Sequence, residues 1–487
     1  MLLSELLNNI EAIQTVDINS PVEIKKITLD SRDAISGSIF VAIKGFKLNG
    51  HDFIEQAVSN GVSAIVLEDA NNDIDQLLRN NNVVKILVKD SRKALPKLSK
   101  TLYNEPSEKL NLIGITGTKG KTTTSYFIKN ILDRAGHLSG VIGTNKNMIG
   151  NVKVPTKLTT PESHVLNDLM SQMVEQKCTD CVMEVSSHSL ELSRVDELDF
   201  NVGVFTNITS DHLDFHSTFE NYLSAKKIFF DQLKSDATVI YNKDDENYTA
   251  LLTNCSANKI SYSLNGEADL EISKVEYDLD GTSFKLSYDN NTYDVHTKLI
   301  GLFNAYNSVA AFGATIISGI EINKAIEGIK STPQVPGRFE VISKSNKKVI
   351  IDYSHTSGSL EEALKAIKHI VKEERKITTV FGCGGDRDKT KRPTMGSVAE
   401  SLSDLVYVTS DNPRTEEPLE IIKDIEAGMK LRKHIVIENR ADAIKKAISA
   451  SDENAVILIA GKGHETYQEI NGVRNYFSDK DEALKHI

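Results

Sequence analysis

The sequence has little cysteine, no long apolar run and no excess of basic residues. Its four cysteines are too few for a disulfide framework. Cys178 and Cys181 form a CxxC pair, but a second pair and a nearby histidine are missing. We therefore interpret them as thiols at the start of a buried strand rather than as zinc ligands. No run of about 18 apolar residues occurs, which argues against a membrane-spanning helix.

The net charge of −11 argues against a general nucleic-acid or anionic-membrane binder, although a local basic pocket for a small anionic substrate stays compatible with it. The first residues, MLLSELLNNIEAIQ, lack the basic start and the long apolar segment of a signal peptide, so we expect a cytoplasmic protein. With 40% hydrophobic and 26% charged residues, the composition is that of an ordinary soluble protein. Its 487 residues predict roughly two to four domains.

Three patterns of strands and helices follow one another along the chain. Residues 1–108 mix short strands with amphipathic segments and predict a small α/β domain. Residues 109–332 begin with an apolar strand, a glycine-rich turn and a helix, and include an antiparallel meander over residues 267–300. Residues 333–487 alternate five strands with helices, which predicts a parallel, doubly wound, Rossmann-like sheet. We therefore expect an α/β fold of three domains with these boundaries.

Polar clusters follow four of the strands predicted in the last domain: DYSH, GCGGDRDK, SDNPR and GKGHE. Because ligands bind beyond the carboxyl ends of parallel strands, this clustering predicts one shared site. Arg414, in the stretch TSDNPRTEEP, lies on one of these turns. Taken alone, it is better interpreted as the ion-pair partner of Glu416 or Glu417 beside it. Its place on a strand-to-helix turn keeps a ligand-binding role open.

Residues 117–122, GTKGKT, join an apolar strand to a helix, as a phosphate-binding loop requires. Glycines let backbone N–H groups approach phosphate oxygens, and the helix N-terminus adds its partial positive charge. Lys121 is placed to reach the terminal phosphates, and the Thr122 hydroxyl is placed to bind Mg²⁺. Ile115 stands where the strict Walker spacing needs a glycine, so the loop is the short form GxxGKT. The sequence therefore predicts an ATP site.

A helix predicted over NYLSAKKIFFDQL carries one lysine among apolar residues. Tyr222, Lys226, Phe229 and Leu233 fall on one face, whereas Lys227 is turned about 100° away. Desolvation lowers the pKa of a lysine, and the neutral amine can add carbon dioxide to form a carbamate. On these residues alone, a lysine whose ammonium group reaches water is the better interpretation.

The short phosphate loop, Glu184 at the end of the strand CVMEV and the segment TNITSDHLDFH together resemble the Mur ligase family of ATP-dependent amide-bond-forming enzymes. The resemblance extends from TLDSR at residues 28–32 to GKGHE at residues 461–465, with the motifs in the family's order. It implies three domains that bind, in turn, a uridine nucleotide, ATP and an amino acid. Two other interpretations stay open. One is a folylpolyglutamate-synthetase-like ligase, which lacks the uridine domain and the DNPR motif, and the other is a non-catalytic nucleotide-binding scaffold.

The resemblance also implies two Mg²⁺ ions. Thr122 and Glu184 are spaced to flank one of them, and so few protein oxygens suit Mg²⁺. His212, which alone would be interpreted as a hydrogen-bonded loop histidine, resembles the family's ligand to the second ion. Lys226 matches the family lysine that carbon dioxide converts to N6-carboxylysine, whose carbamate supports the second ion. The implied catalytic residues are Lys121, Glu184, His212 and Lys226.

Further site residues are implied by the matching motifs. The residues that match the family's uridine-nucleotide site are Leu29, Ser31, Phe46, Lys47 and Leu48. Those that match the site for the muramoyl dipeptide are Thr159, Thr160, Ser186 and Arg194. Those that match the ATP site are Gly117, Thr118, Lys119, Gly120, Lys121, Thr122, Thr123, Asn304, Arg338 and Asp352. Those that match the amino-acid site are Arg387, Asp411, Asn412, Pro413, Arg414, Gly461 and Glu465.

The chain departs from the family pattern in three places. Leu158 and Leu192 stand where some members have polar residues that contact substrate, so side-chain hydrogen bonds are not expected there. The stretch Tyr353-Ser354-His355-Thr356-Ser357 stands where the family has Tyr-Ala-His-Thr-Pro, so Ser357 replaces a proline. We expect that change to affect the stiffness of the loop more than the chemistry.

The implied reaction joins UDP-N-acetylmuramoyl-L-alanyl-D-glutamate to meso-diaminopimelate. A substrate carboxylate attacks the γ-phosphate of ATP to give an acyl phosphate and ADP, and the incoming amino group then displaces phosphate. In the family, DNPR recognises meso-diaminopimelate: a guanidinium holds the carboxylate that lysine lacks, and Glu465 can take the amine. L-Lysine stays open as the alternative amino acid. We expect a monomer with open and closed states, and neither a nucleic-acid nor a membrane partner.

Overall fold

A computed structural model describes residues 1–15, 21–46, 48–344, 346–372 and 374–487. The chain divides into two compact units. The first unit comprises Met1–Asp211, Thr218–Ser261 and Ala310–Ala325, and the second comprises His212–Ser217, Tyr262–Val309 and Ile326–Ile487.

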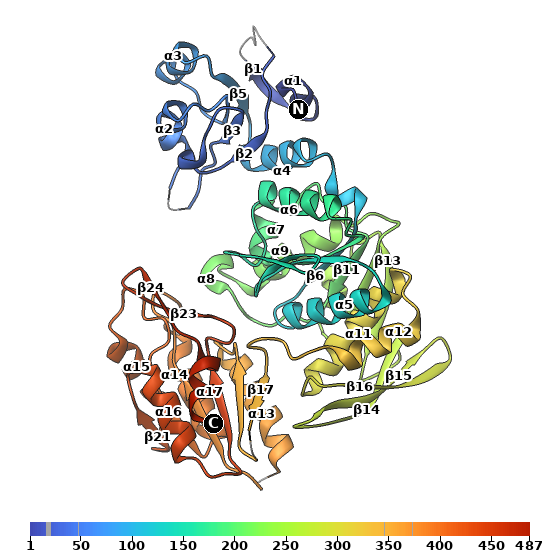
Figure 1. The fold of residues 1–487 in the computed structure, drawn as a ribbon, viewed down its shortest axis with the longest axis vertical. Helices are drawn as coiled ribbons and strands as arrows, with labels where there is room; N and C mark the ends of the chain where they lie inside the picture. The colour runs from blue at the N-terminus through green and yellow to red at the C-terminus, as the bar shows by residue number, and fades with distance from the viewer. Residues whose placement is uncertain (16–20, 47, 345, 373) are drawn as a thin grey trace. The chain divides into compact units, whose positions relative to one another are not determined.

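The first sheet of the first unit has its strands in the order β1-β5-β4-β3-β2 (Figure 1). The strands are β1 (Ala12–Thr15), β2 (Lys26–Thr28), β3 (Ser38–Val41), β4 (Ala64–Leu67) and β5 (Val84–Val88). The α-helices are α1 (Leu3–Leu6), α2 (Ile54–Ser59), α3 (Asn72–Asn80) and α4 (Ser91–Leu102). Short 3₁₀ turns cover Leu7–Asn9, Ser31–Asp33, Gly50–Phe53 and Pro106–Lys109. The sequence predicted β3, β4 and β5 from their apolar runs, whereas β1 is largely exposed and lacks such a run, and β2 has only three residues.

The central sheet of the first unit is built around β6, which runs parallel to β10 on one side and to β11 on the other. Its strands are β6 (Asn111–Thr116), β7 (Ser139–Ile142), β8 (Asn147–Ile149), β9 (Val152–Val154), β10 (Asp180–Glu184), β11 (Val202–Phe205) and β12 (Thr238–Asn242). Glu184 pairs with Ile115, and Phe205 pairs with Thr116, so the three central strands end at the same edge. The loops that follow these strands therefore meet there.

Helices cover both faces of this central sheet, with α5 on one face and α6, α7 and α9 on the other (Figure 1). The helices of this unit are α5 (Lys121–Ala135), α6 (Ser163–Glu175), α7 (Ser187–Glu191), α9 (Phe219–Asp231) and α10 (Tyr248–Leu252), whereas α8 (Leu213–His216) belongs to the second unit. Strand β13 (Asn258–Ser263) spans the division between the units. It precedes the antiparallel meander of β14 (Leu270–Asp278), β15 (Gly281–Tyr288) and β16 (Asn291–Thr297), which the sequence predicted. Helices α11 (Leu302–Ile317) and α12 (Ile322–Ser331) follow.

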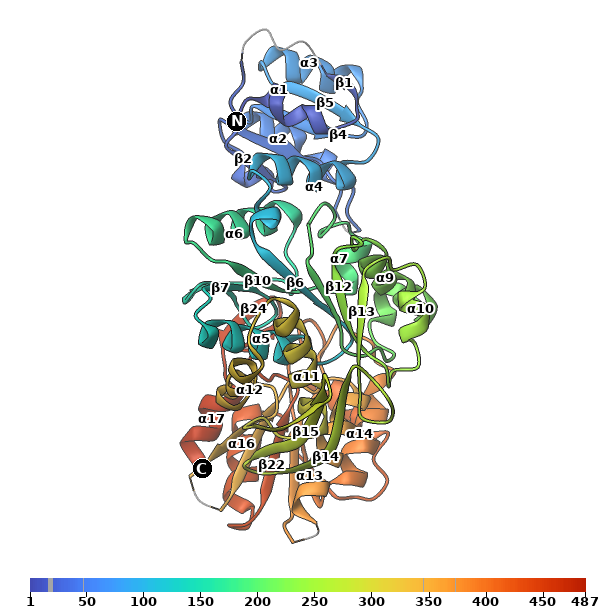
Figure 2. The same cartoon turned by 90° about the vertical axis from the view of Figure 1, so that its right-hand side faces the viewer.

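The last sheet, in the second unit, has the order β17-β18-β22-β19-β20-β21 and is parallel except for β17. Its strands are β17 (Glu340–Ser343), β18 (Lys348–Asp352), β19 (Ile377–Phe381), β20 (Leu405–Val408), β21 (His434–Val436) and β22 (Val456–Ala460). One face packs on α13 (Ser357–Val371), α14 (Lys391–Leu402) and α15 (Pro418–Glu426). The other face packs on α16 (Arg440–Ala450) and α17 (Asp479–His486) (Figure 2). A hairpin of β23 (Tyr467–Ile470) and β24 (Val473–Tyr476) completes the unit.

The fold class predicted from the sequence, α/β, is confirmed. The structure has a small sheet with helices, a central sheet with helices and an antiparallel meander, and a doubly wound Rossmann-like sheet. The predicted division into three domains at residues 108 and 332 stays a prediction. Among the described residues, none of the helices combines the length and the apolar character that crossing a membrane would need.

The start of α13 explains the departure at Ser357 and yields a stability prediction. Ser357 is the first helical residue, where proline is tolerated, and Thr356 before it has the extended backbone that precedes proline (φ −124°, ψ 157°). We expect Ser357→Pro to raise the free energy of unfolding by about 0.4–1 kcal/mol by restricting the unfolded chain. Denaturant unfolding measures this change. Lys365→Pro, inside the same helix, is the control and should cost about 3 kcal/mol or more.

A loss of stability in Ser357→Pro would contradict this account, because it would mean that the backbone N–H of Ser357 is needed. The cap itself does not use that group: the Thr356 hydroxyl accepts from the Ser359 N–H at 3.3 Å.

Candidate active site

The predicted phosphate loop follows β6 and ends where α5 begins. Gly117 has φ +152°, and a Cβ on it would lie 2.0 Å from the Thr206 hydroxyl, so no other residue fits there without displacing the loop. Gly120, with φ +89°, is the residue before the first helical position, Lys121. The Lys121 ammonium group donates to the carbonyls of Gly117 (2.7 Å) and Thr118 (2.9 Å). Ile115, which replaces the strict Walker glycine, lies inside the buried strand β6, where its side chain belongs to the core.

The Glu184 carboxylate lies at the end of β10, beside this loop, and is 1% exposed. It accepts hydrogen bonds from the Thr122 hydroxyl (3.0 Å), the Thr144 N–H (3.0 Å) and the Thr144 hydroxyl (2.8 Å). The sequence predicted the approach of Thr122 to Glu184 but missed Thr144, which follows a short strand and carries no motif. A carboxylate and hydroxyl groups are the hard oxygen donors that suit Mg²⁺, so the donor set fits this ion.

Gly143 is the reason why the Glu184 carboxylate can lie where it does. A Cβ on Gly143 would be 2.4 Å from Glu184 Oε1, the far end of a side chain rather than a backbone atom. We expect Gly143→Ala to lower turnover about 10²-fold, because it moves the carboxylate, while thermal unfolding changes little. Steady-state rates and the melting temperature measure the two effects. If Gly143→Ala keeps the wild-type turnover, the exact position of the Glu184 carboxylate does not matter for the reaction.

Lys226 lies on α9 and is 1% exposed, although it carries an amine. Its Nζ is 2.9 Å from the Gly117 carbonyl and 3.4 Å from the Thr116 hydroxyl, and it lies 4.9 Å from the centre of the Tyr222 ring. Burial, and after it the charge of Lys121, holds the pKa of Lys226 well below its usual value. The prediction that Lys226 lies on the apolar face of its helix is confirmed, whereas the interpretation from these residues alone, an ammonium group that reaches water, is wrong.

Two neighbouring predictions have different outcomes. Lys227 turns away from the core and pairs with Asp231 at 2.5 Å, as the helical spacing indicated. His212 has a left-handed backbone (φ 55°) at the start of α8 and belongs to the second unit. Its role as a ligand to a second ion stays a prediction.

The residues predicted to hold the muramoyl dipeptide gather around the end of β10. The Thr160 hydroxyl donates to the Glu184 carbonyl (2.7 Å) and accepts from the Ser186 N–H (3.1 Å). Arg194 donates to the Thr160 carbonyl (3.1 Å). The Thr159 and Thr144 hydroxyls are 3.1 Å apart, and Arg194 also pairs with Glu162 at 2.8 Å. Leu158 is exposed and Leu192 is half-buried, and neither side chain has a hydrogen-bonding group.

The residues predicted to hold the uridine nucleotide lie beside the first sheet. The Ser31 side chain is buried, and its hydroxyl donates to Gln56 at 2.7 Å. Phe46 and Leu48 are 79% and 68% exposed, which is unusual for large apolar side chains and suits a ligand-binding loop. Leu29 is half-buried and packs against the core of the sheet. Lys47 lies outside the described residues.

Three residues predicted to reach ATP belong to the second unit. Asn304 is buried in the first turn of α11, where it donates to the Ile300 carbonyl (2.9 Å) and accepts from Asn307 (3.1 Å). The Arg338 guanidinium lies 4.7 Å from the centre of the Tyr353 ring. Asp352, at the end of β18, accepts from the Phe339 N–H at 2.7 Å. All three side chains therefore support local structure, and their contacts with ATP stay predictions.

Arg414 lies beyond β20 with a left-handed backbone (φ 54°) and donates to the Gly385 carbonyl at 2.5 Å. Within the described part of the chain, no carboxylate lies within 4.0 Å of its guanidinium, so the expected pairing with Glu416 or Glu417 is wrong. Glu416 is instead held by Arg392 (2.9 Å) and Lys389 (3.0 Å). Arg392 is the main reason why the pKa of Glu416 falls to about 2.

The other residues of the predicted amino-acid site also lie beyond the ends of the strands. Asn412 is buried, and its amide donates to Glu465 at 2.9 Å. Gly461 has φ +117°, and a Cβ there would lie 2.4 Å from the Asp411 carboxylate. Pro413 precedes Arg414 and is buried with the loop. Arg387 is half exposed and lies 3.9 Å from Asp214.

Behind these loops, Arg440 of α16 is fully buried and forms a two-contact ion pair with Asp479 of α17, with both distances 2.7 Å. The same guanidinium donates to the carbonyls of Ala460 (2.9 Å) and Ser410 (3.4 Å). These residues immediately precede Gly461 and Asp411. Arg440 therefore fixes the start of both loops, a role that no motif indicated.

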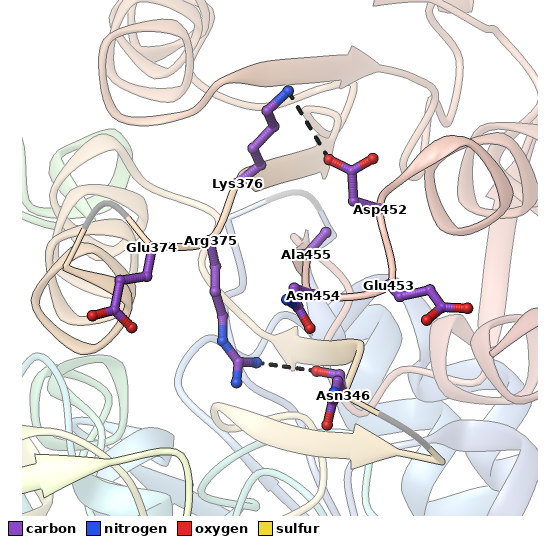
Figure 3. Close-up of a pocket in the computed structure, with 8 residues that line it drawn as sticks. All are labelled: Asn346, Glu374, Arg375, Lys376, Asp452, Glu453, Asn454 and Ala455. Atoms are coloured by element: carbon purple, nitrogen blue, oxygen red, sulfur yellow. Dashed lines mark hydrogen bonds and ion pairs between the residues drawn. The ribbon is translucent and has the colours of Figure 1, made fainter.

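A pocket lies at the opposite end of the same sheet (Figure 3). It is lined by Asn346, Glu374, Arg375, Lys376, Asp452, Glu453, Asn454 and Ala455, next to the amino ends of β18, β19 and β22. Arg375 donates to the Asn346 carbonyl at 3.0 Å, and Lys376 lies 4.0 Å from Asp452. None of the predicted site residues lines it.

Comparison with known proteins agrees with this arrangement. Models of the Mur ligase family match residues 23–103 (family catalytic domain), 115–315 (middle domain) and 337–463 (glutamate ligase domain). A UDP-N-acetylmuramoyl-L-alanyl-D-glutamate–2,6-diaminopimelate ligase from Clostridium acetobutylicum is 43% identical, over 97% of this chain and 96% of its own. The ligase of the same name from Bacteroides thetaiotaomicron is 40% identical over the whole of both chains.

A solved structure of a ligase of this name has a TM-score of 0.67 and 31% identity, over 97% of both chains. Family models, sequence relatives and this structure all match nearly the full length of the chain. The chain therefore belongs to the Mur ligase family of ATP-dependent, amide-bond-forming ligases.

Proposed function

We propose that this protein joins meso-diaminopimelate to UDP-N-acetylmuramoyl-L-alanyl-D-glutamate at the expense of ATP, in the synthesis of a peptidoglycan precursor. The observation that carries the amino-acid assignment is Arg414, whose guanidinium lies on a strand-end loop without a carboxylate partner among the described residues. Diaminopimelate is lysine with a second carboxylate beside its distal amine. A planar guanidinium can hold such a carboxylate through two parallel hydrogen bonds.

The chemistry begins with the carboxylate of the dipeptide, which attacks the γ-phosphorus of ATP. A P–O bond forms, the bond to ADP breaks, and ADP leaves with the electron pair. Lys121 and the N-terminus of α5 are placed beside the phosphate loop, where their positive charge opposes the charge that develops on the transferred group. Mg²⁺ held by Thr122 and Glu184 would neutralise further phosphate charge.

The resulting acyl phosphate is then attacked by the amine of the amino acid. The C–N bond forms, phosphate leaves with its electrons, and the amine loses a proton to solvent. No protein nucleophile is needed. Lys226, as its carbamate, would support a second Mg²⁺, and its burial beside Gly117 supports this role. Thr159, Thr160, Ser186 and Arg194 would hold the dipeptide, because they surround the end of β10.

L-Lysine is the second candidate amino acid. It lacks the carboxylate, so Arg414 would face it without a partner, and we expect it to be a poor substrate. The other interpretations are less well supported. A folylpolyglutamate-type ligase would not need the first sheet, which the family model matches over residues 23–103, and a decayed scaffold would not keep Lys121, Thr122, Glu184 and Lys226 together.

ADP release tests the proposal. The purified protein should release ADP only when the UDP-linked dipeptide, ATP, Mg²⁺ and an amino acid are all present. With meso-diaminopimelate and L-lysine compared side by side, mass spectrometry of the product identifies the amino acid that was added. Absence of ADP release with either amino acid would overturn the ligase proposal, and equal use of both would overturn the role given to Arg414.

A further inference from the structure

A fully buried ammonium group lies directly beyond β22. Lys462 is 0% exposed, and its Nζ is 3.0 Å from Asn412 Oδ1, 3.3 Å from Glu465 Oε2 and 3.7 Å from Asp411 Oδ1. It also lies 5.4 Å from the centre of the Tyr467 ring. Lysine is almost never fully buried unless it is paired. Here its partners come from two different strand-end loops.

The charges around Lys462 do not balance. Its one positive charge faces two carboxylates, Asp411 and Glu465, while the nearby charges of Arg440 and Asp479 neutralise each other. With both carboxylates ionised, the cluster keeps one negative charge. Burial raises the pKa of Glu465, and the charge of Lys462 opposes this rise. Lys462 therefore favours the ionised form of the Glu465 carboxylate, against the effect of burial.

Lys462 is also connected to Arg414 through Asn412. The Asn412 amide oxygen accepts from Lys462 (3.0 Å) and from the Glu469 N–H (3.0 Å), and its NH₂ group donates to Glu465 (2.9 Å). Because the oxygen takes two donors, the NH₂ end must face Glu465. The Glu469 carbonyl in turn accepts from the Arg414 N–H at 3.0 Å. A single hydrogen-bonded network therefore joins Glu465 to the backbone of Arg414.

We propose that Lys462 is a positioning residue for the amino-acid substrate, which holds the Glu465 carboxylate in place and ionised so that it meets the distal ammonium group of the amino acid. Arg414 then takes the carboxylate beside that ammonium group. The inference rests on the proposed function and names the residue that sets the charge of the amino-acid site. Lys462 itself touches none of the reacting atoms.

Lys462→Met tests this role, with Lys365→Met as the matched control. Lys365 is exposed on α13, which packs on the same sheet, and it pairs with Glu361 at the helix surface. We expect Lys462→Met to raise the KM for meso-diaminopimelate roughly tenfold to a hundredfold, because a charged hydrogen bond to Glu465 is lost. The KM values for ATP and for the UDP-linked dipeptide should not change. A rise of all three together would indicate a merely structural role and overturn the proposal.

A second variant covers the case in which Lys462→Met does not fold. Lys462→Met/Glu465→Gln removes one charge of each sign, so the net charge of the buried cluster stays as in the wild-type protein. We compare it with Glu465→Gln alone, which should itself have a raised KM for meso-diaminopimelate. Once the carboxylate is gone, losing Lys462 should raise this KM no further. A further rise of roughly tenfold, which corresponds to the loss of one charged hydrogen bond, would overturn the proposal.

The wild-type protein separates failure of the inference from failure of the proposed function. If the wild-type protein releases no ADP with meso-diaminopimelate, the proposed function fails. If it does so and Lys462→Met keeps the wild-type KM for that amino acid, only the role of Lys462 fails.

Discussion

Replacement of Lys226 by methionine is expected to slow the ligation about 10²- to 10³-fold without unfolding the protein. Burial and the charge of Lys121 lower the pKa of Lys226, so its amine stays uncharged to a lower pH than that of an exposed lysine. The uncharged amine can attack carbon dioxide: an N–C bond forms, and a proton passes to solvent. Methionine keeps an apolar side chain at this buried position of α9 but cannot form the carbamate.

Lys227→Met is the matched control, because Lys227 is the next residue of the helix and pairs with Asp231 outside the core. It should keep the wild-type rate. Labelling with ¹³C-bicarbonate should give a carbamate signal in the carbon NMR spectrum of the wild-type protein and of Lys227→Met, and no such signal in Lys226→Met. A wild-type rate in Lys226→Met, or a carbamate signal that persists there, would show that Lys226 is not the modified residue.

Replacement of Arg414 by alanine is expected to raise the KM for meso-diaminopimelate about 10²-fold, because it removes one partner of a charge pair. The KM for ATP should stay at its wild-type value. Arg414→Lys should recover only part of the loss, since an ammonium group cannot make two parallel hydrogen bonds to a carboxylate. The preference for meso-diaminopimelate over L-lysine should narrow in both variants, because the discriminating contact is weakened.

Arg375→Ala is the control for Arg414→Ala. Arg375 belongs to the same sheet but lines the pocket at its opposite end, where it donates to the Asn346 carbonyl (Figure 3). Its substitution should leave both KM values unchanged. If Arg414→Ala keeps the wild-type KM for meso-diaminopimelate, the guanidinium does not hold the substrate, and the amino-acid assignment loses its main support.

The sequence could predict the parts of the site that depend on neighbouring residues. The phosphate loop is continuous in the chain, and the helical spacing of Tyr222, Lys226 and Phe229 was enough to place Lys226 on the apolar face of its helix, although not to show that its ammonium group is buried. The strand ends of the last domain were also predictable, because four of its apolar runs are followed by polar clusters and parallel strands end at one edge.

The rest depends on contacts between distant parts of the chain. Gly143 shows no unusual φ, and only the nearby Glu184 carboxylate explains why a side chain does not fit there. Glu416 seemed free to pair with Arg414 because Arg392, which holds it, comes 24 residues earlier. Lys462 was passed over inside its own motif, since a buried ammonium group cannot be distinguished in sequence from one that reaches water.

The ion pair between Arg440 and Asp479 has a consequence for genetics. Asp479 lies on the last helix and belongs to none of the motifs, yet through Arg440 it holds the carbonyls that precede Gly461 and Asp411. A substitution there would leave the substrate-binding side chains unaltered and loosen the two loops that carry them. Alleles that map to this helix should therefore give a temperature-sensitive phenotype, with cells that grow at low temperature and lose their wall when warmed.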